Sequence, residues 1–343
     1  MGVDISDLIE AKKISLEDLA GRSIAIDAFN TLYQFLSMIR QQDGTPLIDR
    51  EGRVTSHLSG LFFRSAALLE IGIRPVFVFD GEAPELKRKT IMERVAAKRQ
   101  AEKEWKEALE KGELKKAFSR ATRTARLTDT MIDESAALLD ALGIPWLKAP
   151  SEGEAQMAHM VSKGDVWAGA SQDFDALLFG SPILVRYLTL AGKRRLPSGK
   201  KVDVSPEIIT LSEVLGALQI TREQLVDMGI LVGTDFNYGV KGIGPKKALK
   251  FIKEYGTLER VMEEKAKDLW GGVEGFKEIR KIFLQPNVDE TVRPDWGTIV
   301  KDDIKDFLCK ERDFSEERVE ATLKKLDIVK ETRAQTSLDS FFG

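Results

Sequence analysis

Apolar and polar residues in the first quarter of the chain follow the pattern of strands joined by helices. Up to about Asp80 the expected order is a helix, a strand, two helices separated by a turn-rich loop at 43–46, and a second strand. The strands are the apolar runs 23–26 and 75–79, and the later helices are 30–40 and 56–70. Strands that alternate with helices form a parallel sheet, so we expect an α/β fold with a parallel, helix-flanked central sheet.

Residues 84–126, called the basic segment below, depart from this pattern. Good helix formers dominate while apolar residues are sparse, which predicts helices without a face large enough to anchor them to a core. Residues 86–126 hold 14 Lys or Arg against six Glu, a local charge of +8. We therefore expect a helical segment that is mobile in the absence of a ligand.

The α/β pattern resumes near residue 131, and from about Leu211 the chain is predicted to be mainly helical. The elements in between are a helix from Glu152, a strand near 166–170 and a strand-like run at 183–190.

Composition narrows the location and the chemistry. Of 343 residues, 43% are hydrophobic and 31% charged, which is ordinary for a globular protein. The longest apolar runs are too short to cross a bilayer and the N-terminus lacks a signal-peptide pattern, so we expect an intracellular protein. A single cysteine, Cys309, excludes a disulfide framework and thiolate metal sites. The net charge of −3 alone disfavours a nucleic-acid partner, but the basic segment shows how unevenly that charge is distributed.

Five short stretches carry acids where a buried strand is expected to end or a helix to begin. They are SIAIDAF, VFVFDG, PSEGEA, SQDFDA and GTDFN, and their seven acids are Asp27, Asp80, Glu152, Glu154, Asp173, Asp175 and Asp235. Open α/β sheets gather ligands at that edge, so the carboxylates are expected to converge into a cage of oxygens. Such a cage suits Mg²⁺ or Mn²⁺, and two ions roughly 3.5–4 Å apart would hold a phosphodiester for hydrolysis by water.

Helix capping is the alternative explanation for these acids. Asp27 and Asp175 can each cap a helix, and Ser151 with Glu154 makes a capping box. Two of the stretches, PSEGEA and SQDFDA, carry a pair of acids two residues apart, which capping does not require. Like charges so close are unfavourable unless cations neutralise them, which favours metal binding.

Two divalent ions would leave the cage with three negative charges, so nearby cations are needed to admit a phosphodiester. Lys87 and Arg94 lie seven residues apart, two turns along one helical face, and both could point at the scissile phosphate. A solvated basic face is the alternative for each of them. The two histidines, His57 and His159, stand alone on helical patterns and are expected to be partly buried structural residues.

These motifs, in this order, resemble the flap endonucleases, the structure-specific 5′ nucleases of DNA replication and repair. The resemblance runs from the N-terminal MGV to the final SLDSFFG. It implies that the seven acids are ligands of two metal ions and that Lys87 and Arg94 are catalytic cations. It also implies that Tyr33 stacks on a nucleobase, and that Gly2 packs its freed amino group near the metals.

The resemblance also implies a domain organisation. A nuclease domain would span residues 1–258, with the basic segment as an arch through which a 5′ single strand passes. A C-terminal helical region would follow at 259–330, and a flexible tail at 331–343.

A helix-hairpin-helix element is predicted at residues 236–258. Glycine permits the tight turn, Pro245 can start the second helix, and the free amides of that helix face a phosphate. The expected DNA contacts are Gly242, Gly244, Lys246 and Lys247. The resemblance adds a bound K⁺, and a plain glycine turn is the alternative.

Further DNA contacts are expected elsewhere. Arg64 matches a residue near the family's 3′-flap pocket, although Ala67 stands where a second basic residue is expected in eukaryotic members. Lys193 and Arg194, in a predicted loop before Pro197, are candidates for a second backbone contact, and an exposed charge run is the alternative.

The tail resembles the family's sliding-clamp-binding motif. In one 3₁₀ turn, residues three apart eclipse, so Leu338 and Phe341 would project together with Phe342 beside them, after Gln335. A tail tucked against its own domain is the alternative. No lysine-rich extension follows the motif, which favours an archaeal-type member, in the cytoplasm with the nucleoid; a eukaryotic host would imply the nucleus.

The sequence therefore predicts a monomeric, Mg²⁺-dependent 5′ flap endonuclease and 5′–3′ exonuclease acting on branched DNA. Two alternatives stay open. One is a related nuclease that prefers RNA or another junction, which substrate competition would distinguish. The other is a noncatalytic DNA-binding clamp adaptor, which a Mg²⁺-dependent cleavage assay would distinguish.

Overall fold

The computed structural model of the chain describes residues 2–195, 201–265 and 275–328. Within these ranges, seven strands form one sheet in the order β1-β9-β6-β5-β2-β3-β4. They are β1 Lys12–Lys13, β2 Ser23–Asp27, β3 Arg74–Phe79, β4 Trp146–Lys148, β5 Ala168–Ala170, β6 Ile183–Arg186 and β9 Glu207–Thr210. The five neighbours from β4 to β6 pair in parallel, while β9 and β1 are antiparallel additions at the other edge. The prediction of a parallel, helix-flanked sheet is thus confirmed for the part that carries the predicted site, and the whole sheet is mixed.

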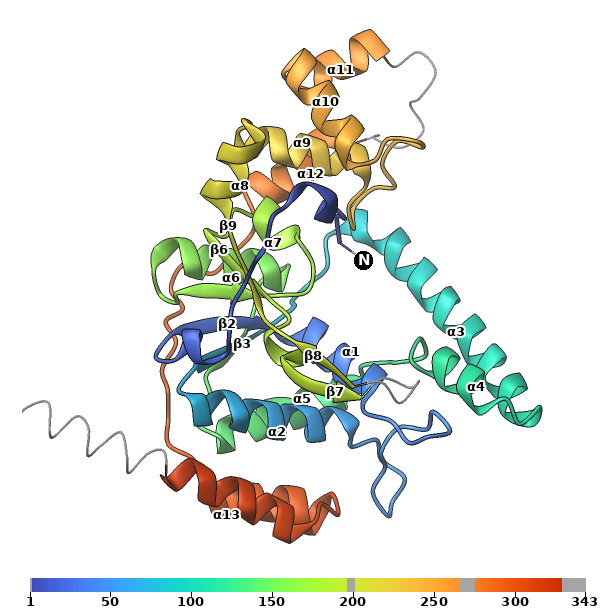
Figure 1. Ribbon diagram of the computed structural model, residues 1–343, viewed down its shortest axis with the longest axis vertical. Coiled ribbons are helices and arrows are strands. Elements are labelled where there is room, and N and C mark those ends of the chain that lie inside the picture. The colour runs from blue at the N-terminus through green and yellow to red at the C-terminus, as the bar shows by residue number, and fades with distance from the viewer. Residues whose placement is uncertain (1, 196–200, 266–274, 329–343) are drawn as a thin grey trace, which may run out of the picture.

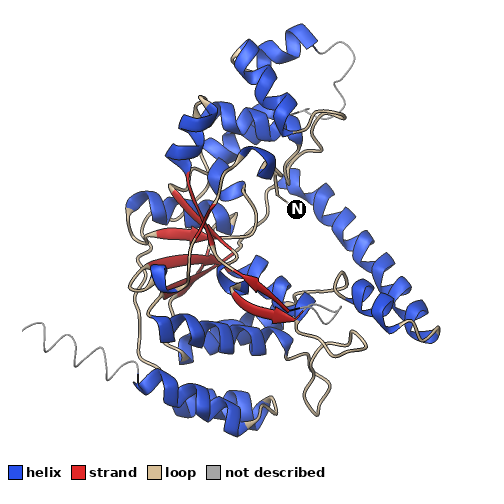
Figure 2. Ribbon diagram, viewed as in Figure 1, coloured by secondary structure: helices blue, strands red, loops and turns tan. Residues whose placement is uncertain are grey.

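Helices cover both faces of the sheet (Figure 2). Successive strand residues point to opposite faces, so Ile24 and Ile26 enter one apolar cluster while Ala25 enters the other. The first cluster includes helices α1 Ala28–Met38, α2 Ser56–Ile71 and α5 Asp129–Ala141. The second includes α6 Gly153–Lys163, α7 Asp175–Leu178 and α9 Arg222–Val232. Burial on both faces explains why the strands are nearly continuous apolar runs.

The chain beyond Leu211 is mainly helical, as predicted. Its further helices are α8 Leu211–Leu218, α10 Pro245–Tyr255, α11 Leu258–Lys265, α12 Phe276–Leu284, α13 Lys301–Lys305, a π-helical turn Asp306–Glu311, and a helix at 316–328. Residues on both sides of position 258 share one apolar cluster, and the last helices pack into the cluster of α2 and α5. The division into regions at this position stays a prediction.

Residues 285–300 form an irregular strap between α12 and α13. The buried amide of Gln156, on α6, donates to the backbone oxygen of Asp289 at 2.9 Å and accepts from its N–H at 2.7 Å. The indole of Trp296 donates to the backbone oxygen of Pro75 at 3.0 Å. The strap thus joins α6, whose start carries Glu152 and Glu154, to β3, which Asp80 follows.

The basic segment is helical, as predicted. It begins with the 3₁₀ turn Glu85–Lys87 and continues as α3 Arg88–Glu110 and α4 Leu114–Ala121. Figure 1 shows α3 starting near the connection between α9 and α10 and running outward, with α4 packed beside its far end. Small side chains let the two helices approach, since Ala101, Ala108, Ala117 and Ala121 are all buried.

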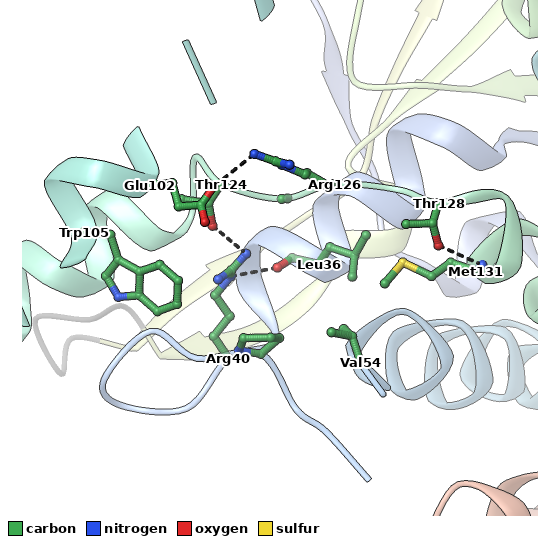
Figure 3. A pocket seen from close by; sticks show the side chains of 11 residues that line it. Leu36, Arg40, Val54, Glu102, Trp105, Thr124, Arg126, Thr128 and Met131 are labelled. Atoms are coloured by element: carbon green, nitrogen blue, oxygen red, sulfur yellow. Dashed lines mark hydrogen bonds and ion pairs between the residues drawn. The ribbon is translucent and has the colours of Figure 1, made fainter. Parts of the chain in front are cut away.

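Polar contacts that the sequence analysis did not foresee anchor the far end of the basic segment. The indole of Trp105 donates to the backbone oxygen of Asp43 at 3.2 Å, and Arg40 reaches Thr124 Oγ1 at 3.4 Å (Figure 3). Trp105, Arg40 and Thr124, with Leu36 and others, line a cavity of about 300 Å³. Polar contacts replace the apolar face that the sequence lacks. Mobility of the segment stays a prediction.

Three local elements differ from prediction. The first helix is reduced to two 3₁₀ turns, Ser6–Leu8 and Glu17–Leu19, and β1 between them adds to the edge of the sheet. The run 183–190 splits into β6 and the 3₁₀ turn Leu188–Leu190, since Tyr187 adopts a positive φ of 60° that ends the strand. The predicted loop before Pro197 is instead part of a hairpin of β7 Gly192–Arg195 with β8 Lys201–Val204. None of the described helices has the length and apolarity needed to cross a membrane.

Candidate active site

All seven predicted acids line a single cavity of about 420 Å³, at the carboxyl edge of the parallel strands. Lys87, Arg94 and Tyr33 line it too. The acids are Asp27, Asp80, Glu152, Glu154, Asp173, Asp175 and Asp235. The predicted convergence of residues spread over more than 200 positions is therefore present in the fold.

Neighbouring strands place most of these acids. Asp27 is the last residue of β2, and Asp80 directly follows β3, the parallel strand paired with it. Asp173 lies between β5 and α7, on the other side of β2. The prediction fails for Asp235, which follows helix α9 and lies in a short turn between Thr234 and Asn237. Its position depends on packing of α9 against α7 rather than on a strand end.

Capping explains little of the set. Asp27 does cap α1, accepting from the N–H of Asn30 at 2.9 Å. The capping box at Ser151 is absent, because its hydroxyl donates instead to the backbone oxygen of Glu82 at 3.1 Å. Asp175 lies in the first turn of α7, where it accepts from the distant N–H of Val3 at 2.7 Å.

Burial makes the ionised cage unfavourable. It raises the pKa of Asp27, Asp80, Glu152, Glu154, Asp173 and Asp175. Neighbouring carboxylates add to this effect, so that the pKa values of Asp27 and Glu154 lie well above the ordinary range. Burial and Asp235 raise the pKa of Asp175 to about 7. The cage therefore requires added positive charge before all of its carboxyls ionise near neutral pH.

Two cations reach into the cage from the basic segment. Lys87 Nζ bonds to Glu152 and lies 3.5 Å from Asp235 Oδ2, while Arg94 Nη2 lies 2.5 Å from Asp235 Oδ1. The Lys87 side chain is 12% exposed, so the solvated-face alternative is wrong for it. Burial acts to lower the pKa of Lys87, but the carboxylates of Glu152 and Asp80 outweigh it and raise that pKa. Burial likewise would raise the pKa of Asp235, yet Lys87 and Arg94 hold it below its ordinary value.

The N-terminus and helix α1 complete the walls. A Cβ on Gly2 would lie 2.6 Å from Asp175 Oδ2, so only glycine fits this approach. Lys98 Nζ lies over the ring of Tyr33, 4.2 Å from its centroid. Sequence reasoning missed Asn30, whose amide donates to Asp173 Oδ2 at 3.1 Å, and Gln34, which also lines the cavity. The signal was available, since positions 30, 33, 34 and 37 share one face of a helix.

The donor set fits hard divalent cations. The acids offer only oxygen atoms as metal ligands, which is what a hard cation such as Mg²⁺ prefers. One of these oxygens, Glu154 Oε1, is buried without a hydrogen-bond partner. Among the described residues no three acids already stand in position to hold one ion. Several oxygens are engaged by the protein itself, as Asp80 Oδ1 is by the N–H of Gly153 at 2.7 Å. Ion binding would therefore have to exchange some of these contacts.

Comparison with known proteins identifies the family. The XPG N-terminal domain matches residues 2–101, and the XPG I-region matches residues 143–235. Flap endonuclease 1 of Pyrococcus furiosus is 49% identical over 346 residues, covering 100% of this chain and 99% of that protein. The chain belongs to the flap endonuclease family.

Solved structures agree with this assignment. The flap endonuclease-1 from Methanococcus jannaschii superposes with a TM-score of 0.76 at 40% identity, covering 97% of this chain and 100% of that one. The catalytic core of Rad2 in complex with DNA substrate follows at a TM-score of 0.69 and 25% identity, covering 92% and 96%. The protein is thus a structure-specific 5′ nuclease, a phosphodiester hydrolase of a metal-dependent family that acts on DNA.

The sequence predicts a helix-hairpin-helix at residues 236–258, but the helix before the turn is α9, which ends at Val232, and only the second helix, α10, lies inside the predicted range. Gly242 adopts a φ of +83° in the connection between them, Gly244 is the N-cap residue, and Pro245 is the first residue of α10. Lys246 lies 3.4 Å from Asp7 Oδ2, and Lys247 Nζ lies 5.7 Å from the ring centroid of Phe251. The predicted turn geometry is confirmed, while its role in DNA binding stays a prediction.

The remaining predicted contacts are separated from the cavity. Arg64 donates to the backbone oxygen of Ala191 at 3.1 Å, at the start of the β7–β8 hairpin that contains Lys193 and Arg194. Burial lowers the pKa of Arg64. The four residues predicted to bind a clamp lie outside the described residues; they are Gln335, Leu338, Phe341 and Phe342.

Proposed function

We propose that this protein is a two-metal 5′ flap endonuclease and 5′–3′ exonuclease that removes 5′ single-stranded flaps during DNA replication and repair. One observation carries the proposal: seven carboxylates, two cations and an aromatic ring line one cavity at the sheet edge. A noncatalytic clamp adaptor does not require this arrangement, and membership of a nuclease family disfavours it.

The carboxylates would hold two Mg²⁺ ions, or Mn²⁺ in their place. Divalent ions at such a site activate water and stabilise the leaving oxygen of a phosphodiester. Lys87 and Arg94 would contact the scissile phosphate, because both already project into the cage from one helical face. Tyr33 would stack on the nucleobase beside the cavity, and Gly2 would let the N-terminus approach Asp175.

The duplex would lie along the α9–α10 connection, where the free amides at the start of α10 would bind a backbone phosphate, with K⁺ as a candidate bridging ion. Arg64 and the hairpin of Lys193 and Arg194 would supply a second contact region. The basic segment would admit the 5′ strand. The tail would bind a sliding clamp, and the nuclease would act as a monomer.

Asp175→Asn tests the metal assignment. The variant should lose cleavage by roughly 10³-fold or more at saturating Mg²⁺, while flap binding stays normal, because the phosphate-binding cations remain. Calorimetric titration with Mg²⁺ should show weakened ion binding in the same variant. Asp133→Asn, an exposed substitution on α5, is the matched control. Normal turnover in Asp175→Asn would refute the assignment.

Substrate competition separates flap cleavage from the other nuclease alternative. A 5′-flap DNA should compete more strongly than an RNA flap, a blunt duplex or a four-way junction. Products mapped at single-nucleotide resolution would then give the balance of endonuclease and exonuclease activity. Stronger competition by RNA or by the junction would reassign the substrate.

A further inference from the structure

The first two turns of α3 contact the loop that leads from α9 into the helix-hairpin-helix, residues 234–238. Glu93 accepts a hydrogen bond from the hydroxyl of Tyr238, and Lys89 Nζ lies over the Tyr238 ring at 4.5 Å from its centroid. The hydroxyl of Thr90 donates to the backbone oxygen of Asp235 at 2.8 Å. The residues of the basic segment and of the loop that meet in these two hydrogen bonds are 145 positions apart in the sequence.

The same loop also meets both proposed catalytic cations. Asp235 pairs with Arg94 at 2.5 Å and lies 3.5 Å from Lys87 Nζ, which in turn lies 6.0 Å from the ring centroid of Phe236. Positions 87, 90 and 94 share one helical face, and positions 89 and 93 share the adjoining face. The loop therefore contacts two neighbouring faces of the helix. One face carries Lys87 and Arg94, and the other carries Lys89 and Glu93.

We propose that Tyr238 and Glu93 form a positioning latch, which fixes the start of α3 to the helix-hairpin-helix loop and so holds Lys87 and Arg94 over the cage. Neither residue lines the cavity that holds the seven acids. Their effect on the reaction passes through the position of the helix. The consequence for cleavage rests on the proposed roles of Lys87 and Arg94. The latch itself rests only on the contacts of Tyr238 and is independent of those roles.

Three features support a latch rather than an incidental surface contact. Apart from its far-end contacts, α3 has few buried side chains, since Ala101 and Ala108 are its only fully buried residues in the described chain. Its first two turns therefore depend on polar contacts. Tyr238 is a large aromatic residue left 53% exposed, and it is held against the helix by Lys89 and Glu93. The bond also has a charged acceptor, which makes it stronger than a neutral pair.

The latch connects two functions. The 234–238 loop continues into Gly242 and α10, the proposed duplex-binding element. A duplex bound there would thus act on the same loop that holds the cations. This arrangement favours correct placement of Lys87 and Arg94 only when the loop itself is ordered.

Hydrogen exchange of the DNA-free protein tests the latch directly. Tyr238→Phe removes the donor and keeps the ring, and Glu93→Ala removes the acceptor. Each should accelerate exchange of the amides at 88–98 by roughly three- to tenfold, the range expected for losing one charge-assisted bond at a partly exposed site. Glu93→Gln keeps an acceptor oxygen and should restore most of the protection. Glu107→Ala removes the same charge from an exposed position on the same helix and should change nothing.

Cleavage kinetics test the consequence. Single-turnover rates at saturating enzyme should fall by roughly three- to tenfold in Tyr238→Phe and Glu93→Ala, with the Kd for a nicked duplex unchanged. The double variant should be no slower than either single one, because both remove the same bond. Glu93→Gln should recover the rate.

The outcomes separate this inference from the proposed function. Unchanged exchange at 88–98 in both single variants, or fully additive effects in the double variant, would overturn the latch even if the protein cleaves flaps normally. Faster exchange with an unchanged single-turnover rate would overturn its role in positioning. A protein whose Asp175→Asn variant retains activity would instead contradict the metal assignment, and the exchange result would still stand.

Discussion

Without divalent ions, the free energy of unfolding should fall as pH rises, because folding raises the pKa of several carboxyl groups in the cage. Such a group binds its proton more tightly in the folded state than in the unfolded one. Its contribution is therefore most favourable below the unfolded pKa and is lost as pH rises through the folded pKa. For Asp175 the limits are 3.8 and about 7, so the loss falls between about pH 4 and pH 7.

The magnitude follows from the same two values. A shift of about three pKa units corresponds to a free energy on the order of 4 kcal/mol at about 1.4 kcal/mol per unit. Asp27 and Glu154, whose pKa values are also raised well above normal, act in the same direction. A bound ion that is present at about 100 times its Kd would return roughly 2.7 kcal/mol. Stabilisation by Mg²⁺ should therefore be large at pH 8 and small at pH 5.

Urea denaturation in EDTA, with wild type beside Asp175→Asn, isolates one carboxyl group from all others that titrate. The amide that replaces this carboxyl cannot ionise, and its oxygen can still accept from the N–H of Val3. Between pH 5 and pH 8 the stability of the variant relative to wild type should rise by roughly 3 kcal/mol, because about two of the three pKa units lie above pH 5. If wild type and variant keep the same difference in unfolding free energy from pH 5 to pH 8, Asp175 does not titrate in this range and the reasoning is refuted.

Three further predictions concern other parts of the molecule. Lys87→Ala and Arg94→Ala should each lower the single-turnover rate by roughly 10²-fold or more while changing flap affinity little, and Lys111→Ala should do neither; a loss of affinity alone would make both cations ordinary backbone contacts. Phe341→Ala with Phe342→Ala should leave flap cleavage intact and remove stimulation by a cognate sliding clamp, and unchanged clamp affinity by calorimetry would contradict this role. Gln156→Ala should reduce the free energy of unfolding by roughly 2–4 kcal/mol in urea, because both backbone groups of Asp289 lose their partner; an effect as small as that of exposed Gln100→Ala would show that the strap contributes little.

Six of the seven cage acids could be located from the sequence because each follows a strand or starts a helix. A strand buried on both faces is a continuous apolar run, so the first acid after the run marks its end. Parallel pairing of β2 with β3 then brings Asp27 and Asp80 to one edge. Asp235 obeys no such rule. Its motif was noticeable only as an acid after an apolar run, and that run proved to be helix α9.

Long-range polar contacts were not predictable in the same way. The bonds of Gln156 to Asp289 and of Tyr238 to Glu93 join segments more than 130 residues apart and depend on the final packing of helices. A low apolar content led to the expectation that the basic segment has no apolar face large enough to anchor it. The indole of Trp105 and the guanidinium of Arg40 supply anchors that a count of apolar residues does not register.

The charges of the cage divide into two groups according to their partners. For Asp27, Glu154 and Asp175 the strongest charged neighbours are other carboxylates, so without ions their charge is relieved mainly by protonation. For Glu152 and Asp235 the strongest charged neighbour is instead the Lys87 ammonium group. The protein can thus fold around seven acids before any ion binds. The same arrangement sets a condition on catalysis, since Lys87 cannot hold Glu152 and a phosphate with full strength at once. Substrate binding should therefore weaken the Lys87–Glu152 pair, and a Glu152→Gln variant should bind 5′-flap DNA at least as tightly as wild type in EDTA.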